Sequence, residues 1–153
     1  MERWLCDFNK KGRYISSIED FDNYENLIGF VYKITNLKTG RFYIGKKSFY
    51  HKRKTKIGKR EKAATKTRKR YKVVVKESNW LVYHGSCKEL NKDIQQLGPD
   101  PFRREILETC CSKKYLNFCE VEHQIKNDVL KINSYNGNIL GKYYSQDMKN
   151  CKN

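Results

Sequence analysis

The stretch GFVYKITNLKTGRFYIGKK, residues 29–47, holds two short runs of aromatic and β-branched residues on either side of a turn. Such runs are typical of β-strands, so we expect strands over residues 28–35 and 41–45. The intervening NLKTG has the composition of a tight turn, in which Gly40 can take a positive φ. The stretch therefore predicts a β-hairpin, around which the rest of the fold is expected to assemble.

Two tyrosines of this hairpin, Tyr32 and Tyr43, are predicted to share one face. A turn over residues 37–40 gives cross-strand partners whose numbers add up to about 75 or 77, and any odd sum puts both side chains on the same side. Their Cβ atoms are then roughly 5–8 Å apart. Two neighbouring phenols can pack together in a core or can take part in a reaction. The pattern alone leaves both interpretations open.

A dense basic tract follows the hairpin. The 153 residues carry a formal net charge of +16, and 15 of the 33 Lys and Arg residues lie between residues 46 and 76, where Glu61 is the one acid. The rest of the chain holds 18 basic and 16 acidic residues and is nearly neutral. A basic segment of this kind is either a solvated loop or a surface for a polyanion. We favour the second interpretation, with nucleic acid as the partner.

The residues after the hairpin predict two helices separated by a charged segment. We expect a helix over residues 49–57, and a mobile segment over residues 59–72, which lack an apolar stripe. The next helix is expected to start at Ser86, which forms a capping box with Glu89, and to end at Gly98.

The C-terminal half adds a strand and a longer helix. FRREILE, residues 102–108, predicts a third strand. The last helix is expected from Ser112 to about Leu130, with one apolar face made of Phe118, Val121, Ile125 and Val129. The order β-β-α-α-β-α predicts the α/β (α+β) class, with a small central antiparallel three-stranded sheet flanked by helices. We expect one domain over residues 28–145 with the basic insertion at 46–76, an N-terminal appendage over 1–27 and a tail over 146–153.

Several short motifs occur in an order that resembles one nuclease family. Phe30-Val31-Tyr32 is followed, ten residues later, by Tyr43-Ile44-Gly45 and then by Arg53; YHGSCKEL, FRREIL and a glutamate-bearing helix come after them. Over about residues 29–138 these motifs resemble the GIY-YIG nucleases, most of all the small phage-type members of the homing or Seg-like kind. Two departures stand out. The first glycine, Gly29, is one place early, and no histidine stands just after Arg53, where several family members have one, so a histidine general base is not expected here.

The resemblance implies metal-assisted hydrolysis of a DNA phosphodiester, with Mg²⁺ or Mn²⁺ as the cofactor. In that family's pattern Tyr32 would orient or deprotonate the attacking water, and Tyr43 would hydrogen-bond the water or the phosphate. Arg53 would clamp the phosphate, because its planar fork suits phosphate oxygens. Asn136 would position other groups rather than react. The side chains expected to contact nucleic acid are Lys46, Lys47, Lys52, Lys54, Lys66, Arg68, Lys69 and Arg70.

The metal ligand is expected to be one acidic residue on the last helix, and two candidates stand two residues apart. A helical wheel places Glu122 among the predicted apolar residues, where a carboxylate is costly unless it is paired or binds a metal. The small phage-type members, however, carry their glutamate nine residues before a Val-Leu pair. This spacing matches Glu120 before Val129 and Leu130. We favour Glu120 and keep Glu122 as the alternative.

The expected function is that of a DNA endonuclease of homing or restriction type, which either nicks or cuts both strands. The alternative is a module of the same fold that binds nucleic acid without cutting it, and an RNA substrate is a third reading. We expect double-stranded DNA as the partner and no membrane, since no stretch approaches the ~20 apolar residues that span a bilayer. Two strand cuts would suit a homodimer. The N-terminus lacks the apolar core of a secretion signal, so we expect a cytoplasmic protein, phage-encoded by resemblance.

Overall fold

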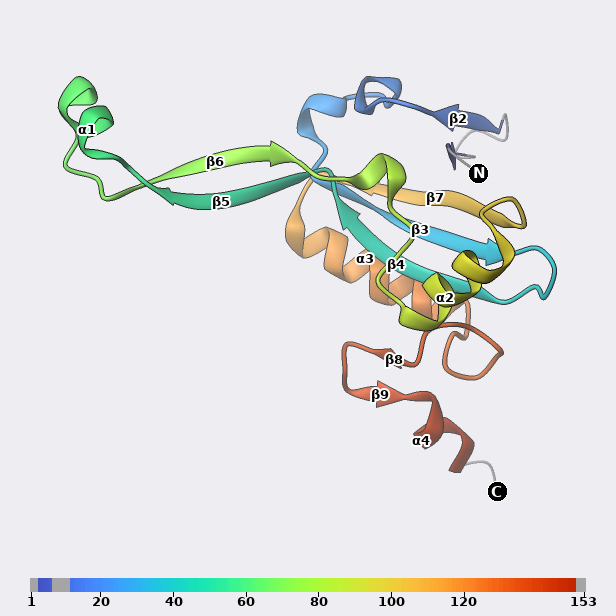
Figure 1. Cartoon of the computed structure of the whole chain (residues 1–153). Helices are drawn as coiled ribbons and strands as arrows, with labels where there is room; N and C mark the ends of the chain where they lie inside the picture. Colours follow the sequence, from blue (N-terminus) through green and yellow to red (C-terminus); the bar gives the residue numbers. More distant parts are fainter. Residues whose placement is uncertain (1–2, 7–11, 151–153) are drawn as a thin grey trace.

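A mixed five-stranded sheet forms the centre of the molecule (Figure 1). The computed structural model describes residues 3–6 and 12–150. The strands lie in the order β2-β1-β7-β3-β4. Only β1 and β7 run parallel, and the other neighbours are antiparallel. The five strands are β1 (Trp4–Cys6), β2 (Arg13–Ile15), β3 (Gly29–Asn36), β4 (Phe42–Ser48) and β7 (Phe102–Cys110).

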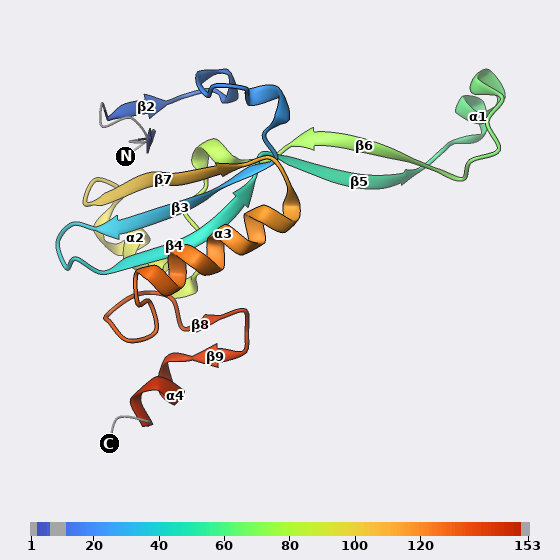
Figure 2. The same cartoon turned by 180° about the vertical axis from the view of Figure 1, so that it is seen from behind.

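Two hydrophobic clusters cover the two faces of this sheet. One contains Phe30, Tyr32 and Trp80 and includes the buried residue of α2 (Lys88–Leu97), Leu90. The other contains Val31 and Ile44 and includes residues of α3 (Lys113–Lys126), which packs across β3, β4 and β7. Figures 1 and 2 show α2 and α3 on opposite sides of the sheet. Alternating residues of the inner strand β3 therefore enter two different cores, as the β period requires.

The sheet is wider than predicted. The predicted antiparallel three-stranded unit is present as β7-β3-β4, but β1 and β2 extend it to five strands and make it mixed. These strands come from the segment that we assigned to an N-terminal appendage, of which residues 1–2 and 7–11 lie outside the described part. Trp4 and Ile15 are buried in the core, and they form a cross-strand pair. Three-residue strands are too short to show a hydrophobic period, so the sequence pattern missed them.

The helix predicted over residues 49–57 is wrong. Residues Tyr50–Lys56 form β5, which pairs antiparallel with β6 (Tyr71–Glu77), and the two strands project from the domain as an arm (Figures 1 and 2). A helix here would have placed lysines four residues apart on one side, where they repel. The valine-rich β6 instead supplies β-branched cross-strand partners. The tip of the arm carries α1 (Lys59–Thr65), in the segment expected to be mobile.

The apolar face predicted for the last helix is only half right: Val121 and Val129 do pack in the core, but the other two residues do not. Ser112 does cap α3, because its side chain accepts a hydrogen bond from the Tyr115 amide. However, Phe118 and Ile125 are 60% and 61% exposed, and the buried side chains of α3 are Leu116, Cys119 and Gln124. The helix is thus turned so that a polar residue, Gln124, faces the sheet, where its amide donates to the Ile44 carbonyl.

The remaining elements are short. Three 3-10 turns are η1 (Ile18–Asp20), η2 (Tyr24–Asn26) and η3 (Trp80–Val82). The C-terminal segment forms β8 (Asn138–Ile139), β9 (Tyr143–Tyr144) and α4 (Ser145–Asn150), and residues 151–153 of the predicted tail lie outside the described part. Among the described residues, no helix is both long enough and apolar enough to cross a bilayer.

Candidate active site

The β3–β4 hairpin places its two tyrosines as predicted. Tyr32 pairs with Gly45 and Tyr43 pairs with Ile34, so both pairs have the odd sum that puts the tyrosines on one face. Their ring centroids are 6.1 Å apart. The turn residue Gly40 has a φ of 71°. The two phenols are therefore diagonal neighbours on the face that α2 covers.

Glycine at position 45 makes room for the Tyr32 side chain. A Cβ at this position would lie 2.6 Å from Tyr32 Oη and 2.8 Å from Tyr43 Cε1. On the other side of β3, the register with β7 shifts between Val31 and Tyr32. Such bulges redirect side chains near functional sites. The glycine and the bulge together fix where the Tyr32 hydroxyl lies.

We expect Gly45→Ala to disturb both tyrosines. The added methyl group has no room beside the two rings, and overpacking of this kind typically costs about 1–3 kcal/mol. Thermal unfolding should therefore show a lower midpoint, and the ultraviolet absorbance of tyrosine should change. Gly58→Ala is the matched control, because nothing lies within 4 Å of a Cβ at that position. Equal stability of the two variants would contradict this role of Gly45.

A third tyrosine, to which the sequence analysis gave no role, joins the pair from the loop before α2. The ring of Tyr83 packs edge-on against Tyr32 at 6.0 Å, and Ser86 Oγ lies 3.3 Å from Tyr43 Oη. Ser86 is not the cap of α2, since Cys87 occupies that position. Glu89, its predicted capping partner, instead pairs with Arg41 through both carboxylate oxygens. The YHGSCKEL motif was the available signal, but the sequence analysis gave a capping role to its Ser86 and Glu89 and no role to its tyrosine.

A buried arginine holds the loop that carries Tyr83 through hydrogen bonds to its carbonyl oxygens. Arg104 is 1% exposed, and its Nη1 donates to the carbonyl oxygens of Leu81 and Tyr83 at 2.9 and 3.0 Å. Its guanidinium lies 4.6 Å from the Trp4 ring, and burial lowers its pKa to about 10. Trp4 Nε1 in turn donates to the Trp80 carbonyl. The N-terminal strand β1 therefore supports the tyrosine cluster.

Glu120 and Lys46 meet at the edge of the sheet beside this cluster. Lys46 Nζ lies 2.5 Å from Glu120 Oε2, and the Glu120 side chain is 17% exposed. Both line a pocket of about 350 Å³ together with Tyr43. The other residues of this wall are Cys87, Gln124, Tyr135, Asn136, Gly137, Asn138 and Leu140. A carboxylate, a cation and a phenol thus converge on one polar pocket.

The alternative carboxylate lies elsewhere on α3. Glu122 makes a surface ion pair with Lys126, one turn further along the helix, at 2.8 Å. The helical wheel had placed it among Phe118 and Ile125, but that side of α3 faces solvent. Of the two candidates, only Glu120 lines the pocket with Tyr43.

Asn136 holds strand β4 in place. Its Oδ1 accepts from the Ile44 amide at 2.9 Å, and its Nδ2 donates to the Ile44 carbonyl at 2.8 Å. Tyr135 adds a bond from its amide to the Phe42 carbonyl. The segment therefore continues the sheet beyond β4 and fixes Tyr43 and Gly45, the neighbours of Ile44.

The structure does not bring Arg53 to this cluster. Arg53 lies in β5 on the exposed arm, opposite Val74. Of the other basic candidates, Lys47 packs its Nζ over the Tyr83 ring and donates to Asn79, and burial lowers its pKa. The remaining ones are all exposed and lie on the arm: Lys52, Lys54, Lys66, Arg68, Lys69 and Arg70.

Burial controls the protonation of the two hairpin tyrosines. Desolvation raises the pKa of Tyr32 well above its ordinary value, and the neighbouring Tyr43 and Tyr83 raise it further. Desolvation also raises the pKa of Tyr43, although the hydrogen bond to Ser86 works against this shift. Both side chains are therefore neutral phenols near pH 7. They can donate hydrogen bonds, and they are poor bases as they stand.

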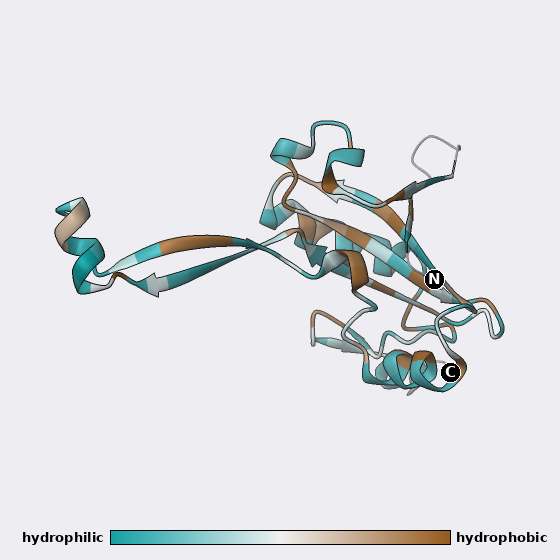
Figure 3. Cartoon of the chain, turned by 45° about the horizontal axis from the view of Figure 1, so that its top comes forward, coloured by the Kyte–Doolittle hydropathy of each residue, from teal (hydrophilic) through white to brown (hydrophobic). Residues whose placement is uncertain are grey.

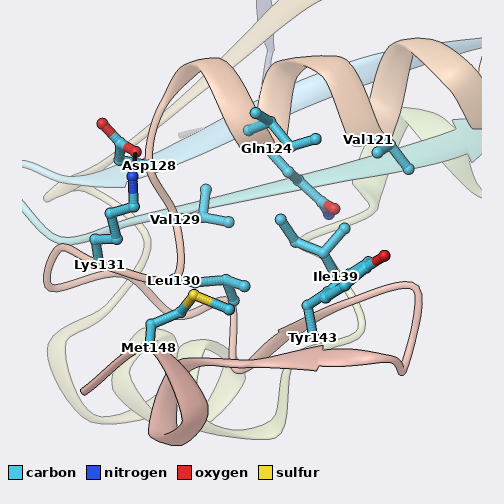
Figure 4. Close-up of a pocket in the computed structure, with 10 residues that line it drawn as sticks. Val121, Gln124, Asp128, Val129, Leu130, Lys131, Ile139, Tyr143 and Met148 are labelled. Atoms are coloured by element: carbon cyan, nitrogen blue, oxygen red, sulfur yellow. Dashed lines mark ion pairs between the residues drawn. The ribbon is translucent and has the colours of Figure 1, made fainter. Parts of the chain in front are cut away.

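A second, apolar pocket lies on the far side of Gln124 (Figure 4). It encloses about 260 Å³ between α3 and the C-terminal segment, and its apolar lining includes Val121, Val129, Ile139 and Met148. Its charged residues, Asp128 and Lys131, pair with each other at 3.0 Å. This pocket lies where the C-terminal segment packs against the domain, and its lining holds no cluster of reactive groups.

The comparison with protein families agrees with the resemblance seen in the sequence. Residues 14–148 match the family described as "Putative endonuclease segE, GIY-YIG domain". No protein with a curated description matches the chain, and no solved structure matches it. Since the family match covers most of the chain, the protein belongs to the GIY-YIG endonucleases of the Seg-like type.

Proposed function

We propose that the protein hydrolyses phosphodiester bonds of double-stranded DNA with the help of Mg²⁺ or Mn²⁺, as a homing- or restriction-type endonuclease. The observation that carries this proposal is the pocket in which Glu120, Lys46 and Tyr43 meet. A module that only binds nucleic acid has no need of a partly buried carboxylate paired with a lysine. The basic arm supplies the attraction for DNA.

The donor set at this pocket fits a magnesium-type ion. Glu120 offers carboxylate oxygens in a polar pocket. Among residues 3–6 and 12–150, no group of three or more His, Cys, Asp and Glu side chains could hold a metal. Mg²⁺ suits such a place, because it is commonly bound by one or two carboxylates and keeps several waters. The ion would polarise the scissile phosphate and acidify a water.

The chain's own residues then have separate tasks. Lys46 neutralises Glu120 in the free protein, and with DNA bound it is available to a phosphate oxygen. Tyr43 donates a hydrogen bond into the pocket, where a water or a phosphate oxygen would lie. Tyr32 is 1% exposed and does not line this pocket, and its raised pKa makes it a poor base at pH 7, so we do not expect it to deprotonate water.

Arg53 enters this proposal as a DNA-binding residue of the arm. Lys46 stands seven residues before it, and extended chain of that length spans roughly 20 Å. At such a separation the two cations do not contact the same phosphate. Lys46 is therefore the cation that we assign to the scissile phosphate.

Incubation with supercoiled plasmid tests the proposal. With Mg²⁺ we expect open-circular or linear product, and with EDTA we expect none; the product form separates nicking from double-strand cutting. Sequencing the ends separates a restriction-type site from a long homing-type site. A parallel reaction with duplex RNA should give no cleavage. Binding without any cleavage, in Mg²⁺ and in Mn²⁺, would identify a non-cleaving module instead.

A further inference from the structure

The β5–β6 arm is a two-stranded ribbon with both faces in solvent. The strands pair over seven residues each, from Tyr50 opposite Glu77 to Lys56 opposite Tyr71, and every one of their side chains is exposed. Figure 1 shows the ribbon leaving the domain where β4 ends. An isolated two-stranded ribbon is only marginally stable in water. A ribbon of this length is therefore expected to bind something along its faces.

The two faces of the ribbon differ in chemistry. Directly opposite residues share a face, so a lysine–valine face can be read from the register: Tyr50, Lys52, Lys54 and Lys56 on β5, and Tyr71, Val73, Val75 and Glu77 on β6. On this face Tyr71, Val73 and Val75 are 56%, 58% and 57% exposed. Figure 3 shows the hydrophobic stretch of β6 on the arm. A row of apolar side chains lies in water beside a row of lysines.

The opposite face is less free. It carries His51, Arg53, Thr55, Lys72, Val74 and Lys76. Its Lys72 is already paired with Glu61 of α1, Nζ to Oε1 at 2.5 Å. On the lysine–valine face the one acid, Glu77, stands at the base of the arm and accepts a hydrogen bond from Trp80 Nε1. The middle of the lysine–valine face thus presents cations and apolar groups without an acid.

We propose that the ribbon enters the major groove of duplex DNA with its lysine–valine face toward the bases. The groove is about 12 Å wide and admits a two-stranded ribbon. Lysines bind guanine O6 and N7, and apolar side chains contact thymine methyl groups. Both rows of this face therefore find complementary groups in the groove. The major groove of duplex RNA is too narrow for this.

The length of the arm determines which base pairs, counted from the cut, it can contact. Seven residues of strand span roughly 23 Å, the length of about seven base pairs. Its middle lies roughly 20–25 Å along the chain from Lys46. The contacted bases should therefore lie about six or seven base pairs to one side of the cut. This inference rests on the proposed DNA substrate, but binding can be measured without cleavage.

Guanine methylation tests the proposal. The probe is a 40-base-pair duplex with a randomised centre, bound in EDTA so that no cutting occurs. Dimethyl sulfate methylates guanine N7 in the major groove, and we expect this treatment to weaken binding at least fivefold. A minor-groove ligand such as netropsin should leave binding within twofold. Sensitivity to netropsin but not to methylation would overturn the proposal, and so would equal affinity for duplex RNA.

Two double variants with the same loss of charge test which face is used. Lys52→Gln with Lys54→Gln changes the lysine–valine face, and Lys72→Gln with Lys76→Gln changes the opposite face. We expect the first to bind at least about tenfold more weakly and to lose its sensitivity to methylation. The second should keep that sensitivity. It should lose some affinity and show a flatter salt dependence, because it loses contacts with phosphates. The reverse pattern, or equal loss in both, overturns the assignment of the face.

These outcomes are separate from those of the cleavage test. A protein that binds methylated DNA poorly but never cuts would remove the proposed hydrolysis and leave the docking of the arm. A protein that cuts plasmid but whose binding does not change on guanine methylation would remove the docking of the arm and leave the proposed hydrolysis. Circular dichroism of both double variants should match the wild type, because all four lysines are exposed.

Discussion

Glu120→Gln is expected to bind DNA at least as well as the wild type in EDTA and to cut it at least about 10²-fold more slowly at every Mg²⁺ concentration. The substitution keeps the size of the side chain and removes the charge that would attract the cation. Affinity holds or rises because a negative charge near the phosphate is gone and Lys46, its partner at 2.5 Å, becomes free. Single-turnover rates and Kd values measure the two effects separately.

Glu122→Gln is the matched control for this result. It makes the same chemical change two residues away, and it breaks only a surface ion pair with Lys126. Such pairs contribute about 0.3–0.5 kcal/mol in helices, so the fold should persist. Activity should stay within about tenfold of the wild type. An active Glu120→Gln together with a folded but inactive Glu122→Gln would show that the helical wheel had located the metal ligand correctly.

The hairpin was predictable because its signals are local. The strand runs, the turn at Gly40 and the odd register follow from residues close together in the chain, and the register alone puts Tyr32 and Tyr43 on one face. The family spacing likewise pointed to Glu120, which the structure places in the pocket with Tyr43. The hairpin depends little on the rest of the fold, whereas the role of Glu120 as a metal ligand stays a prediction.

The arm and the helix face were not predictable from local pattern. β5 is a strand only because β6 supplies its partners, and Arg53 and Val74 are 21 positions apart in the sequence. In α3 two large apolar residues, Phe118 and Ile125, face outward, while the polar Gln124 faces inward. A hydrogen bond to the Ile44 carbonyl makes that burial acceptable. A helical wheel reads side-chain type and cannot see such a partner on another element.

The position of Arg53 has the largest consequence for function. The motif order suggested a phosphate clamp, but the residue lies on the arm, and Lys46 lies beside Glu120 and Tyr43. The role of the N-terminal strand β1 could not be predicted from local sequence pattern either. Trp4 and Arg104 support the loop of Tyr83 from segments about one hundred residues apart.

Lys46→Met is the second change for which we expect a large effect. The side chain keeps much of its length and apolar stem but loses the cation that the proposal places at the scissile phosphate. Removal of one such transition-state donor costs about 10²–10³-fold in rate, so single-turnover cleavage at saturating DNA should fall by at least 10²-fold. Lys46→Arg keeps the charge and should recover part of the rate.

Two further variants make the result decisive. Lys38→Met is the control for the loss of one positive charge. It removes an exposed lysine in the β3–β4 turn and should cleave like the wild type. Arg53→Lys tests the assignment drawn from the motif order, because it keeps the charge but loses the planar fork. If Arg53→Lys fails to cut at saturating DNA while Lys46→Met cuts normally, DNA binding must bend the arm onto the pocket. In that case Arg53, and not Lys46, is the cation that stabilises the transition state.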